Sequence, residues 1–320
     1  FFCQVEAVET AIWLTEVAPS QPKFKKYLEH LEATNTEANP GLMRLALKLA
    51  TGAGKTTVMA MLMAWQTLNA VRNPLKKSFT KGFLIVAPGI TIKDRLRVLK
   101  PNDPDAYYAR RELIPQDMLQ DMQQARVVIT NFHAFRLREK TDVSKGTRSA
   151  IEGWRGETLL TQETEGEMLS RVMPELMGLK RIAVFNDEAH HCYRECPGAQ
   201  EDLEAELSAL DTIERKDARA EAEENNEAAR IWISGLEIVQ RKLGDARIFD
   251  LSATPFFLRG SGYAEGTLFP WTMSDFSLMD AIECGIVKLP RVHVAQNISR
   301  YEMPMFRTLF QHIRTDMPKK

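Results

Sequence analysis

LKLATGAGKTT, residues 47–57, is the stretch that decides the fold. It begins as an apolar run of the kind that ends a buried strand, and it breaks into Gly52 and Gly54 before Lys55 and Thr56. Because glycine has no Cβ, such a backbone can fold tightly around an anion, with several N–H groups and the start of the next helix pointing at it. The stretch therefore predicts a strand, a phosphate-binding loop and a helix in succession, as in a P-loop nucleotide-binding domain.

Each residue type in this loop has a task in binding ATP with Mg²⁺. Lys55 is placed to reach the β and γ phosphates, and the Thr56 hydroxyl is placed to hold Mg²⁺. Leu49 stands where the strict pattern G-x-x-x-x-G-K-[ST] has glycine. The alternative, a glycine-rich turn that only connects two elements, is disfavoured by Gly-Lys-Thr-Thr after a strand. The expected ATP-binding residues of the loop are Thr51, Gly52, Ala53, Gly54, Lys55, Thr56 and Thr57.

Composition indicates a globular protein. The 320 residues are 44% hydrophobic, enough for one large α/β domain or two smaller ones. No window approaches 18 uncharged apolar residues, and FFCQVEAVET lacks the pattern of a signal peptide, so neither a membrane partner nor secretion is expected. Four cysteines do not make a disulfide framework in a chain of this length, which favours a cytoplasmic location. Because the chain begins with Phe, we expect it to be part of a longer protein.

Charge is segregated along the chain. The formal net charge is −1, so any surface that binds nucleic acid must be local. Lysine and arginine gather in 91–111, whereas aspartate and glutamate dominate 195–229. The basic run is either a binding surface or a solvated helix face.

Five short apolar segments predict the strands of a sheet. They are LALKLA (45–50), FLIVAP (83–88), RVVIT (126–130), RIAVFND (181–187) and RIFDLSA (247–253). Near-continuous apolar runs are typical of parallel strands that are buried on both faces. The segments between them suit helices, and AARIWISGLEIVQRKLG ends in Gly244 as a helix stop. This alternation predicts an α/β fold with a doubly wound, mainly parallel sheet, in which ligands bind at the carboxyl ends of the strands.

Two adjacent acids follow the fourth of these segments. AVFNDEAHH, residues 183–191, delivers Asp187 and Glu188 at a strand end, where two carboxylates are costly to desolvate without a positive charge. Mg²⁺ supplies that charge if Asp187 holds it through its water shell, while Glu188 orients and deprotonates the attacking water. The alternative is that both acids face solvent at a loop start. We expect the glycine loop and the acid pair to meet across neighbouring strands around one triphosphate.

The order of these and further motifs resembles superfamily 2 helicases and translocases, whose motor domains are RecA-like. APG (87–89), ITNFHAF (129–135) and LSATP (251–255) are similar to motifs Ia, Ib and III. The resemblance implies that Gln4 reads the adenine edge, to which a side-chain amide can both donate and accept. It also assigns His190 a part in catalysis, and it links Ser252 and Thr254 to the DEAH carboxylates, unless they only start a turn before a proline.

YYARRELIP, LRGSGYAEGTLFPW and SDFSLMDAIECGIVKLPRV narrow the resemblance to ATPase subunits of type III restriction enzymes and related phage-defence proteins. That resemblance implies ATP-driven action on double-stranded DNA and a possible modification (methyltransferase) subunit as partner. Loops at strand ends contact phosphates without reading bases. The expected nucleic-acid contacts are Gly89, Thr91, Lys93, Thr130 and Asn131, with ordinary turn and helix-cap residues as the alternative.

A zinc site formed by His190, His191, Cys192 and Cys196 is conceivable. We disfavour it, because no second CxxC pair exists and His190 already has a role in the resemblance.

The expected domain organisation has three parts. Residues 1–40 form a helical segment that carries the glutamine, and 41–290 form the first RecA-like domain, with polar insertions at 141–178 and 196–229. Residues 291–320 form an exit strand or linker toward a second RecA-like domain, which must supply arginines against the γ phosphate. The isolated chain is therefore expected to bind ATP with Mg²⁺ weakly and to hydrolyse it slowly. The alternatives are a P-loop kinase, a nucleotide-binding scaffold of a defence complex, and an RNA helicase.

Overall fold

The computed structural model describes residues 1–139, 162–196, 203 and 212–288. The chain divides into two units, Phe1–Val287 and Lys288–Lys320, and the fold below is that of the first. The expected exit strand at 291–320 lies outside the described residues, as do parts of both expected insertions.

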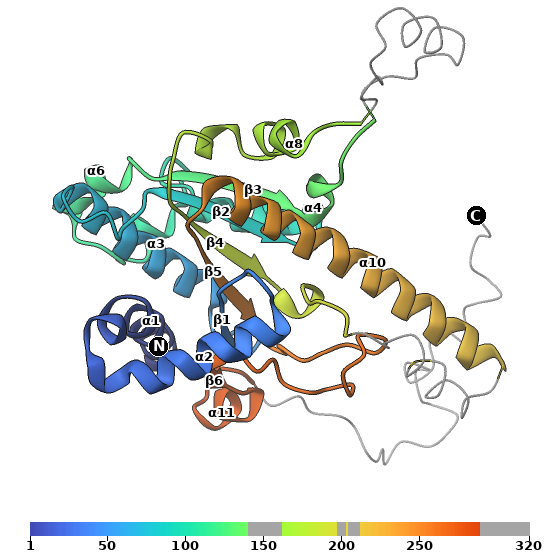
Figure 1. Ribbon diagram of the computed structural model, residues 1–320. Helices are drawn as coiled ribbons and strands as arrows, with labels where there is room; N and C mark the ends of the chain where they lie inside the picture. Colours follow the sequence, from blue (N-terminus) through green and yellow to red (C-terminus); the bar gives the residue numbers. More distant parts are fainter. Residues whose placement is uncertain (140–161, 197–202, 204–211, 289–320) are drawn as a thin grey trace, which may run out of the picture. The chain divides into compact units, whose positions relative to one another are not determined.

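Six parallel strands form one sheet in the order β3-β2-β4-β5-β1-β6 (Figure 1). Five of them were expected from the sequence, and each lies within one residue of its expected bounds at either end. The α/β P-loop fold with a doubly wound parallel sheet is thereby confirmed. The strands are β1 (Arg44–Leu49), β2 (Gly82–Ala87), β3 (Arg126–Asn131), β4 (Ile182–Asp187), β5 (Ala246–Ser252) and β6 (Thr272–Phe276).

The edge strand β6 was not expected. Its sequence, TMSDF, has two apolar and three polar side chains. An edge strand has a neighbouring strand on one side only and is more exposed, so it tolerates polar side chains. It pairs with β1 across a register shift between Ala46 and Leu47. The sequence signal for such a strand is weak, since half-exposed strands lack the continuous apolar run of central ones.

The two faces of the sheet are covered by different helices. Alternate strand residues point to opposite faces, and Phe83, Ile85 and Phe249 pack with α1 (Phe2–Ile12) and α3 (Lys55–Arg72). On the other face, Leu84 and Ile248 pack with α8 (Glu165–Val172) and α10 (Thr212–Leu243). Figure 1 shows α10 running across this face of the sheet, beside α8.

The remaining helical elements connect the strands. They are α2 (Lys25–Ala38), α4 (Ile90–Leu96), α5 (Tyr107–Arg110), α6 (Leu119–Met122) and α11 (Leu278–Glu283), a π turn at Trp13–Val17, and 3₁₀ turns at Ala18–Ser20, Pro22–Phe24, Arg97–Leu99, Gln116–Met118, Phe132–Phe135, Pro174–Leu176 and Ala189–His191. Helix α11 begins with a capping box formed by Ser277 and Asp280.

Part of each expected insertion packs against the domain. Helix α10 is continuous through the acidic segment into the expected core helix, and Ala222 on it is 1% exposed. Met168 and Leu169 of α8 are fully buried in the core. Both segments are polar in sequence and were expected to be insertions, but a few buried positions are enough to pack a helix against the domain.

The strands that carry the glycine loop and the acid pair are not neighbours, which corrects the expected geometry. β5 lies between β1 and β4 and pairs with both of them. Apolar runs show that strands exist, but they do not give the order of strands in a sheet. The site is therefore built across three strands, and β5 brings Ser252 to its centre.

Candidate nucleotide site and adjoining surfaces

The loop after β1 has the geometry of an anion cradle. Gly52 and Gly54 have φ of +88° and +97°, in the left-handed region that favours glycine. Gly54 is the N-cap of α3, whose first turn has N–H groups without helical partners. A Cβ on Gly54 would lie 2.2 Å from the Nε2 of Gln4, so a larger residue here would strain the backbone and displace the Gln4 amide.

Gln4 contacts this loop from α1. Its side-chain Nε2 donates a 2.8 Å hydrogen bond to the carbonyl oxygen of Ala53, and Gln4 itself is 7% exposed. The glutamine expected to read adenine therefore lies at the glycine loop, about fifty residues away in sequence. Its role toward adenine stays a prediction.

The lysine of the loop and the second acid are in contact. Lys55 Nζ lies 2.7 Å from Glu188 Oε1, and the two side chains are 13% and 31% exposed. Glu188 has a φ of +53°, a conformation that non-glycine residues rarely adopt and that is concentrated at functional sites. The structure thus brings the glycine loop and the DEAH segment together in one site.

Asp187 is the more buried of the two acids. Its exposure is 8%, and burial and the neighbouring Glu188 raise the pKa of its carboxyl to about 6, against the lowering effects of Lys55 and Arg95. Arg95 belongs to α4, and the sequence analysis gave it no role in this site. A carboxylate held in this way favours a nearby cation, because a cation offsets the cost of its ionisation.

The oxygen donors here suit Mg²⁺. Thr56 is half-buried on the first turn of α3, and Asp187 ends β4. Within the described ranges, no group of three or more His, Cys, Asp or Glu side chains is arranged to hold a metal ion. The fit is still good, since Mg²⁺ is usually bound by one or two protein ligands, substrate phosphates and water.

His190 joins the DEAH segment to β5. Its Nδ1 lies 2.9 Å from Ser252 Oγ and 3.7 Å from Glu188 Oε2. Burial and the adjacent His191 lower the pKa of His190 to about 4, so the ring is neutral at physiological pH. The expected link from Ser252 is therefore made through the histidine, and Thr254 contributes its backbone N–H, which donates to Ser252 Oγ at 3.1 Å.

A buried polar network lies beneath this site, and sequence reasoning missed it. Asp250 on β5 forms a 2.9 Å ion pair with Arg44 at the start of β1, and both side chains are fully buried. Asp250 also accepts a 2.7 Å hydrogen bond from Asn186, which directly precedes Asp187, and a 2.8 Å bond from Trp271. Asn186 and Asp250 were visible as polar residues within two of the expected apolar runs, whereas Arg44 directly precedes the run at 45–50. This network joins the start of β1 to residues near the carboxyl ends of β4 and β5.

Cys192 lies beside this network. Its carbonyl oxygen accepts a 2.7 Å hydrogen bond from Arg44, and burial raises the pKa of its thiol to about 12.

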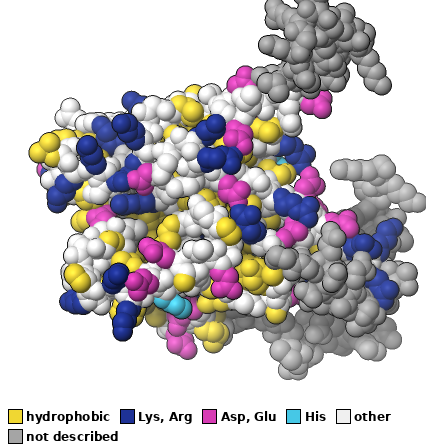
Figure 2. Space-filling view, in the orientation of Figure 1, with side chains coloured by type: hydrophobic (Ala, Val, Ile, Leu, Met, Phe, Trp, Pro, Cys, Tyr) yellow, Lys and Arg dark blue, Asp and Glu magenta, His cyan; other side chains and the backbone are white. Residues whose placement is uncertain are grey.

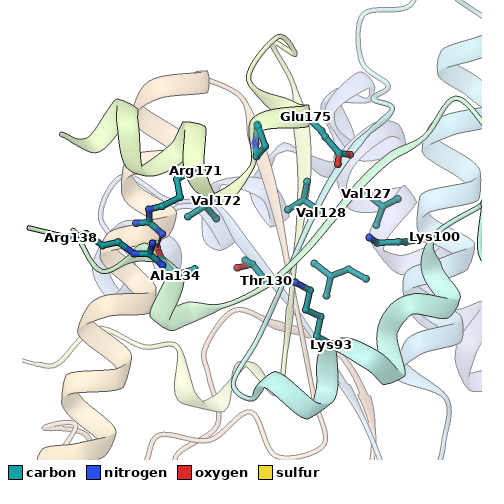
Figure 3. A pocket seen from close by; sticks show the side chains of 12 residues that line it. Lys93, Lys100, Val127, Val128, Thr130, Ala134, Arg138, Arg171, Val172 and Glu175 are labelled. Atoms are coloured by element: carbon teal, nitrogen blue, oxygen red, sulfur yellow. Dashed lines mark hydrogen bonds between the residues drawn. The ribbon is translucent and has the colours of Figure 1, made fainter. Parts of the chain in front are cut away.

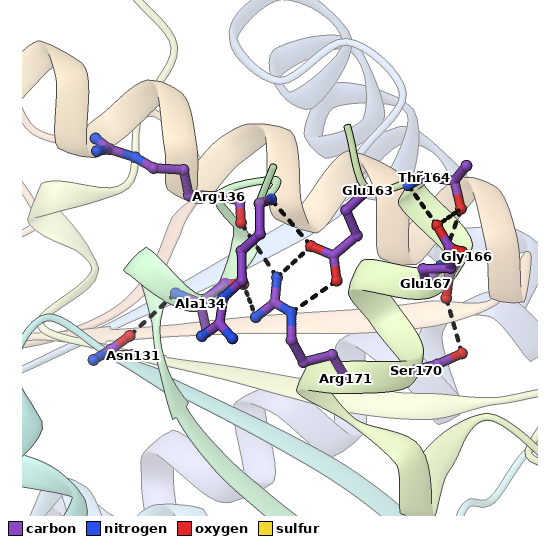
Figure 4. Close-up of polar contacts among 10 residues, drawn as sticks. Asn131, Ala134, Arg136, Glu163, Thr164, Gly166, Glu167, Ser170 and Arg171 are labelled. Atoms are coloured by element: carbon purple, nitrogen blue, oxygen red, sulfur yellow. Dashed lines mark hydrogen bonds and ion pairs between the residues drawn. The ribbon is translucent and has the colours of Figure 1, made fainter. Parts of the chain in front are cut away.

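The expected nucleic-acid residues lie on another part of the domain. Lys93 and Thr130 line a pocket of about 360 Å³ along the edge strand β3, together with Lys100, Arg138 and Arg171 (Figure 3). Arg171 is held by Glu163 at 2.8 Å, as Figure 4 shows, whereas Lys93 and Lys100 point toward the pocket. The charged side chains that line the pocket are therefore four cations and one acid, Glu175, and most of the other lining residues are apolar.

The other expected contacts differ in what the structure shows. Gly89 is the extended N-cap residue of α4. The side chain of Thr91 lies outside the described part of the structure. Asn131 Oδ1 accepts a 3.1 Å hydrogen bond from the N–H of Ala134, so this side chain caps a 3₁₀ turn (Figure 4).

Charge on the described surface is mixed. On the face seen in Figure 2, lysine and arginine side chains are interspersed with aspartate and glutamate, in keeping with the formal net charge of −1. Of the described helices, none combines the length and apolar character needed to cross a membrane.

Comparison with known proteins gives one match. A family model described as type III restriction enzyme, res subunit, matches residues 3–257. No curated protein and no solved structure matches the chain significantly.

Proposed function

Because the chain belongs to the family of type III restriction enzyme res subunits, we propose that it is the ATP-driven motor domain of a DNA-dependent ATPase. The family itself is one of ATP-binding, helicase-like hydrolases. The observation that carries the proposal is the 2.7 Å contact of Lys55 with Glu188, which joins a glycine cradle to an acid pair. Such a constellation is what binding and hydrolysis of a magnesium-bound triphosphate require.

The proposed roles follow from the contacts of each residue. Lys55 leaves Glu188 and binds the β and γ phosphates, and the freed Glu188 carboxylate orients and deprotonates water. Asp187 and Thr56 hold Mg²⁺, which neutralises charge on the phosphate oxygens when it is bound. Binding of the triphosphate thus converts Glu188 from an ion-pair partner into a base. This exchange prevents the base from acting before the lysine is occupied.

We propose that Ser252 and His190 couple this site to the DNA surface. Their 2.9 Å contact connects the end of β5 to the acid pair, so a change at Glu188 reaches the segment after β5 directly. Gly89, Lys93 and Thr130 serve as backbone contacts to DNA, with Thr91 and Asn131 as further candidates. Contacts of this kind position a strand without reading its sequence and weaken steeply with salt.

The complete motor needs groups beyond the residues placed here. We propose that a second RecA-like domain supplies arginines against the γ phosphate, and that a modification subunit directs the protein to its sites. Both proposals rest on the family and on the general requirements of phosphoryl transfer.

Phosphate release by the full-length protein tests this function. Wild-type protein is expected to release phosphate faster with duplex DNA than with single-stranded DNA, RNA or no nucleic acid, and Lys55→Ala is expected to abolish release. Equal release with and without nucleic acid would overturn the motor assignment, and no release under any condition would favour a nucleotide-binding scaffold. If RNA alone stimulated phosphate release, the motor would act on RNA instead of DNA.

A further inference from the structure

We propose that Arg111 is a positioning residue of the nucleotide site, which contacts the ribose and α phosphate end of ATP with Tyr107 as its support. The inference rests on the proposed function, since it requires that the glycine loop binds a nucleotide. It gives a role to a residue of YYARRELIP, a stretch used above only for the family resemblance, and Arg111 directly follows α5.

The first observation is a contact between Arg111 and the nucleotide-binding helix. Arg111 Nη1 donates a 2.9 Å hydrogen bond to Thr57 Oγ1, fifty-four residues away in sequence. Thr57 lies in the first turn of α3 and is 5% exposed. Its Oγ1 lies 3.5 Å from a Cβ built on Gly54, so the hydroxyl that Arg111 contacts lies beside the last glycine of the loop.

The second observation is that Arg111 is held in this position. Its Cζ lies 3.8 Å from the centroid of the Tyr107 ring, and its Nη2 donates a 3.1 Å hydrogen bond to the Tyr107 hydroxyl. The next residue, Glu112, has a φ of +50°, one of two non-glycine residues with positive φ among those described, and Glu188 is the other. A stacked, forked guanidinium is pre-organised to bind an anion, and lysine does not reproduce it.

The third observation concerns charge. In the described ranges no carboxylate lies within ion-pair distance of Arg111, whereas the adjacent Arg110 contacts Asp105 on the surface. Arg111 is exposed, yet it turns to a neutral threonine hydroxyl at the glycine loop. A phosphate or ribose oxygen is a better acceptor for a guanidinium than a neutral hydroxyl is.

The position of Thr57 indicates which end of the nucleotide Arg111 meets. Successive helix residues are about 100° apart, so Thr57 points away from Lys55, which reaches the acid pair. The Thr57 hydroxyl instead lies with the Gln4 amide near the site of a Gly54 Cβ. Gln4 is the residue expected at adenine, and Lys55 marks the γ phosphate end. Arg111 therefore belongs to the adenosine side, at the ribose and α phosphate.

Equilibrium binding of fluorescent ATP and ADP to the full-length protein tests the assignment. Arg111→Ala is expected to weaken both nucleotides about tenfold, as loss of a charge-assisted hydrogen bond does, because both carry the α phosphate. Tripolyphosphate, which has no ribose but carries a phosphate in the α position, should compete less well in the variant than in the wild type. Arg111→Lys should recover part of the loss, and Arg110→Ala is the matched control, expected to bind as wild type does.

The outcomes separate this inference from the function on which it rests. If Lys55→Ala loses nucleotide binding while Arg111→Ala binds like Arg110→Ala, the Arg111 assignment is wrong and the nucleotide site stands. A loss confined to ATP would also overturn it, by placing Arg111 at the γ phosphate. If wild-type protein binds neither nucleotide, both the function and the Arg111 inference fail. Circular dichroism of each variant shows that it is folded.

Discussion

Replacing Glu188 by Gln is expected to strengthen ATP binding and to stop ATP hydrolysis, and the contacts of Glu188 give the reason for both effects. Lys55 is paired with Glu188 at 2.7 Å, and the side chains are 13% and 31% exposed. Nucleotide binding must break this pair and place phosphates next to the carboxylate. A partly exposed ion pair contributes about 1 kcal/mol. The variant should therefore bind ATP about fivefold more tightly, while hydrolysis stops because an amide cannot accept a proton.

Isothermal titration with Mg²⁺ and ATP measures the first effect, and phosphate release by the full-length protein measures the second. Asp121→Asn is a matched control, since Asp121 also forms a 2.7 Å ion pair, with Arg72 at the far end of α3, and is 26% exposed. It should change neither quantity. Weaker ATP binding by Glu188→Gln, or undiminished phosphate release, would refute the exchange of Lys55 between carboxylate and phosphate.

Three further substitutions test the acid Asp187, the buried polar network around Asp250, and the packing of α10 against Phe135. Burial raises the pKa of the Asp187 carboxyl to about 6, so ionisation of this carboxyl destabilises the fold as pH rises above 3.8. Asp187→Asn should therefore raise the free energy of unfolding at pH 7.5 by at most about 3 kcal/mol, and this gain should disappear below pH 4. The same substitution should also remove the dependence of nucleotide binding on Mg²⁺. Asp250→Asn leaves Arg44 charged and buried without its partner, and urea denaturation should show a loss of about 3–5 kcal/mol. Gly235→Ala places a Cβ 2.3 Å from the Phe135 ring, and thermal denaturation should show a loss of about 1–3 kcal/mol despite the better helix propensity of alanine.

The Asp250 and Gly235 variants each have a control in the same chain. Asp275→Asn removes a carboxylate that pairs with Lys48 at 2.8 Å but is 53% exposed, and it should change stability by less than about 1 kcal/mol. Gly166→Ala adds a Cβ in open space within α8 and should leave the protein as stable or slightly more so. Equal losses in the Asp250 and Asp275 variants would refute the buried network, and a stabilising Gly235→Ala would refute the close approach of α10 to Phe135.

The sequence was sufficient for the elements that carry apolar runs. Five strands and the α/β fold follow from near-continuous apolar segments, because strands buried on both faces need them. The edge strand Thr272–Phe276 lacked that signal. The order of the strands could not be predicted either, because no local sequence pattern indicates that β5 lies between β1, which precedes the glycine loop, and β4, which ends in Asp187.

The site divides in the same way. Lys55, Asp187 and Glu188 stand in local patterns whose chemistry can be read one residue at a time. The roles of Arg111 and Asp250 could not be predicted in this way, because they depend on contacts with residues fifty or more positions away in sequence. Arg111 contacts Thr57, and Asp250 contacts Arg44. Polar residues inside apolar runs were the available signal for the buried network, and they indicate that a partner exists without identifying it.

The most direct test of one shared site for triphosphate and metal is titration of ATP into the wild-type, Lys55→Ala and Asp187→Asn proteins, with and without Mg²⁺. The structure predicts a single site in the wild type that is strengthened by Mg²⁺. It predicts no binding by Lys55→Ala, and binding by Asp187→Asn that no longer depends on Mg²⁺. Wild-type affinity in Lys55→Ala, or an undiminished effect of Mg²⁺ in Asp187→Asn, would contradict the account.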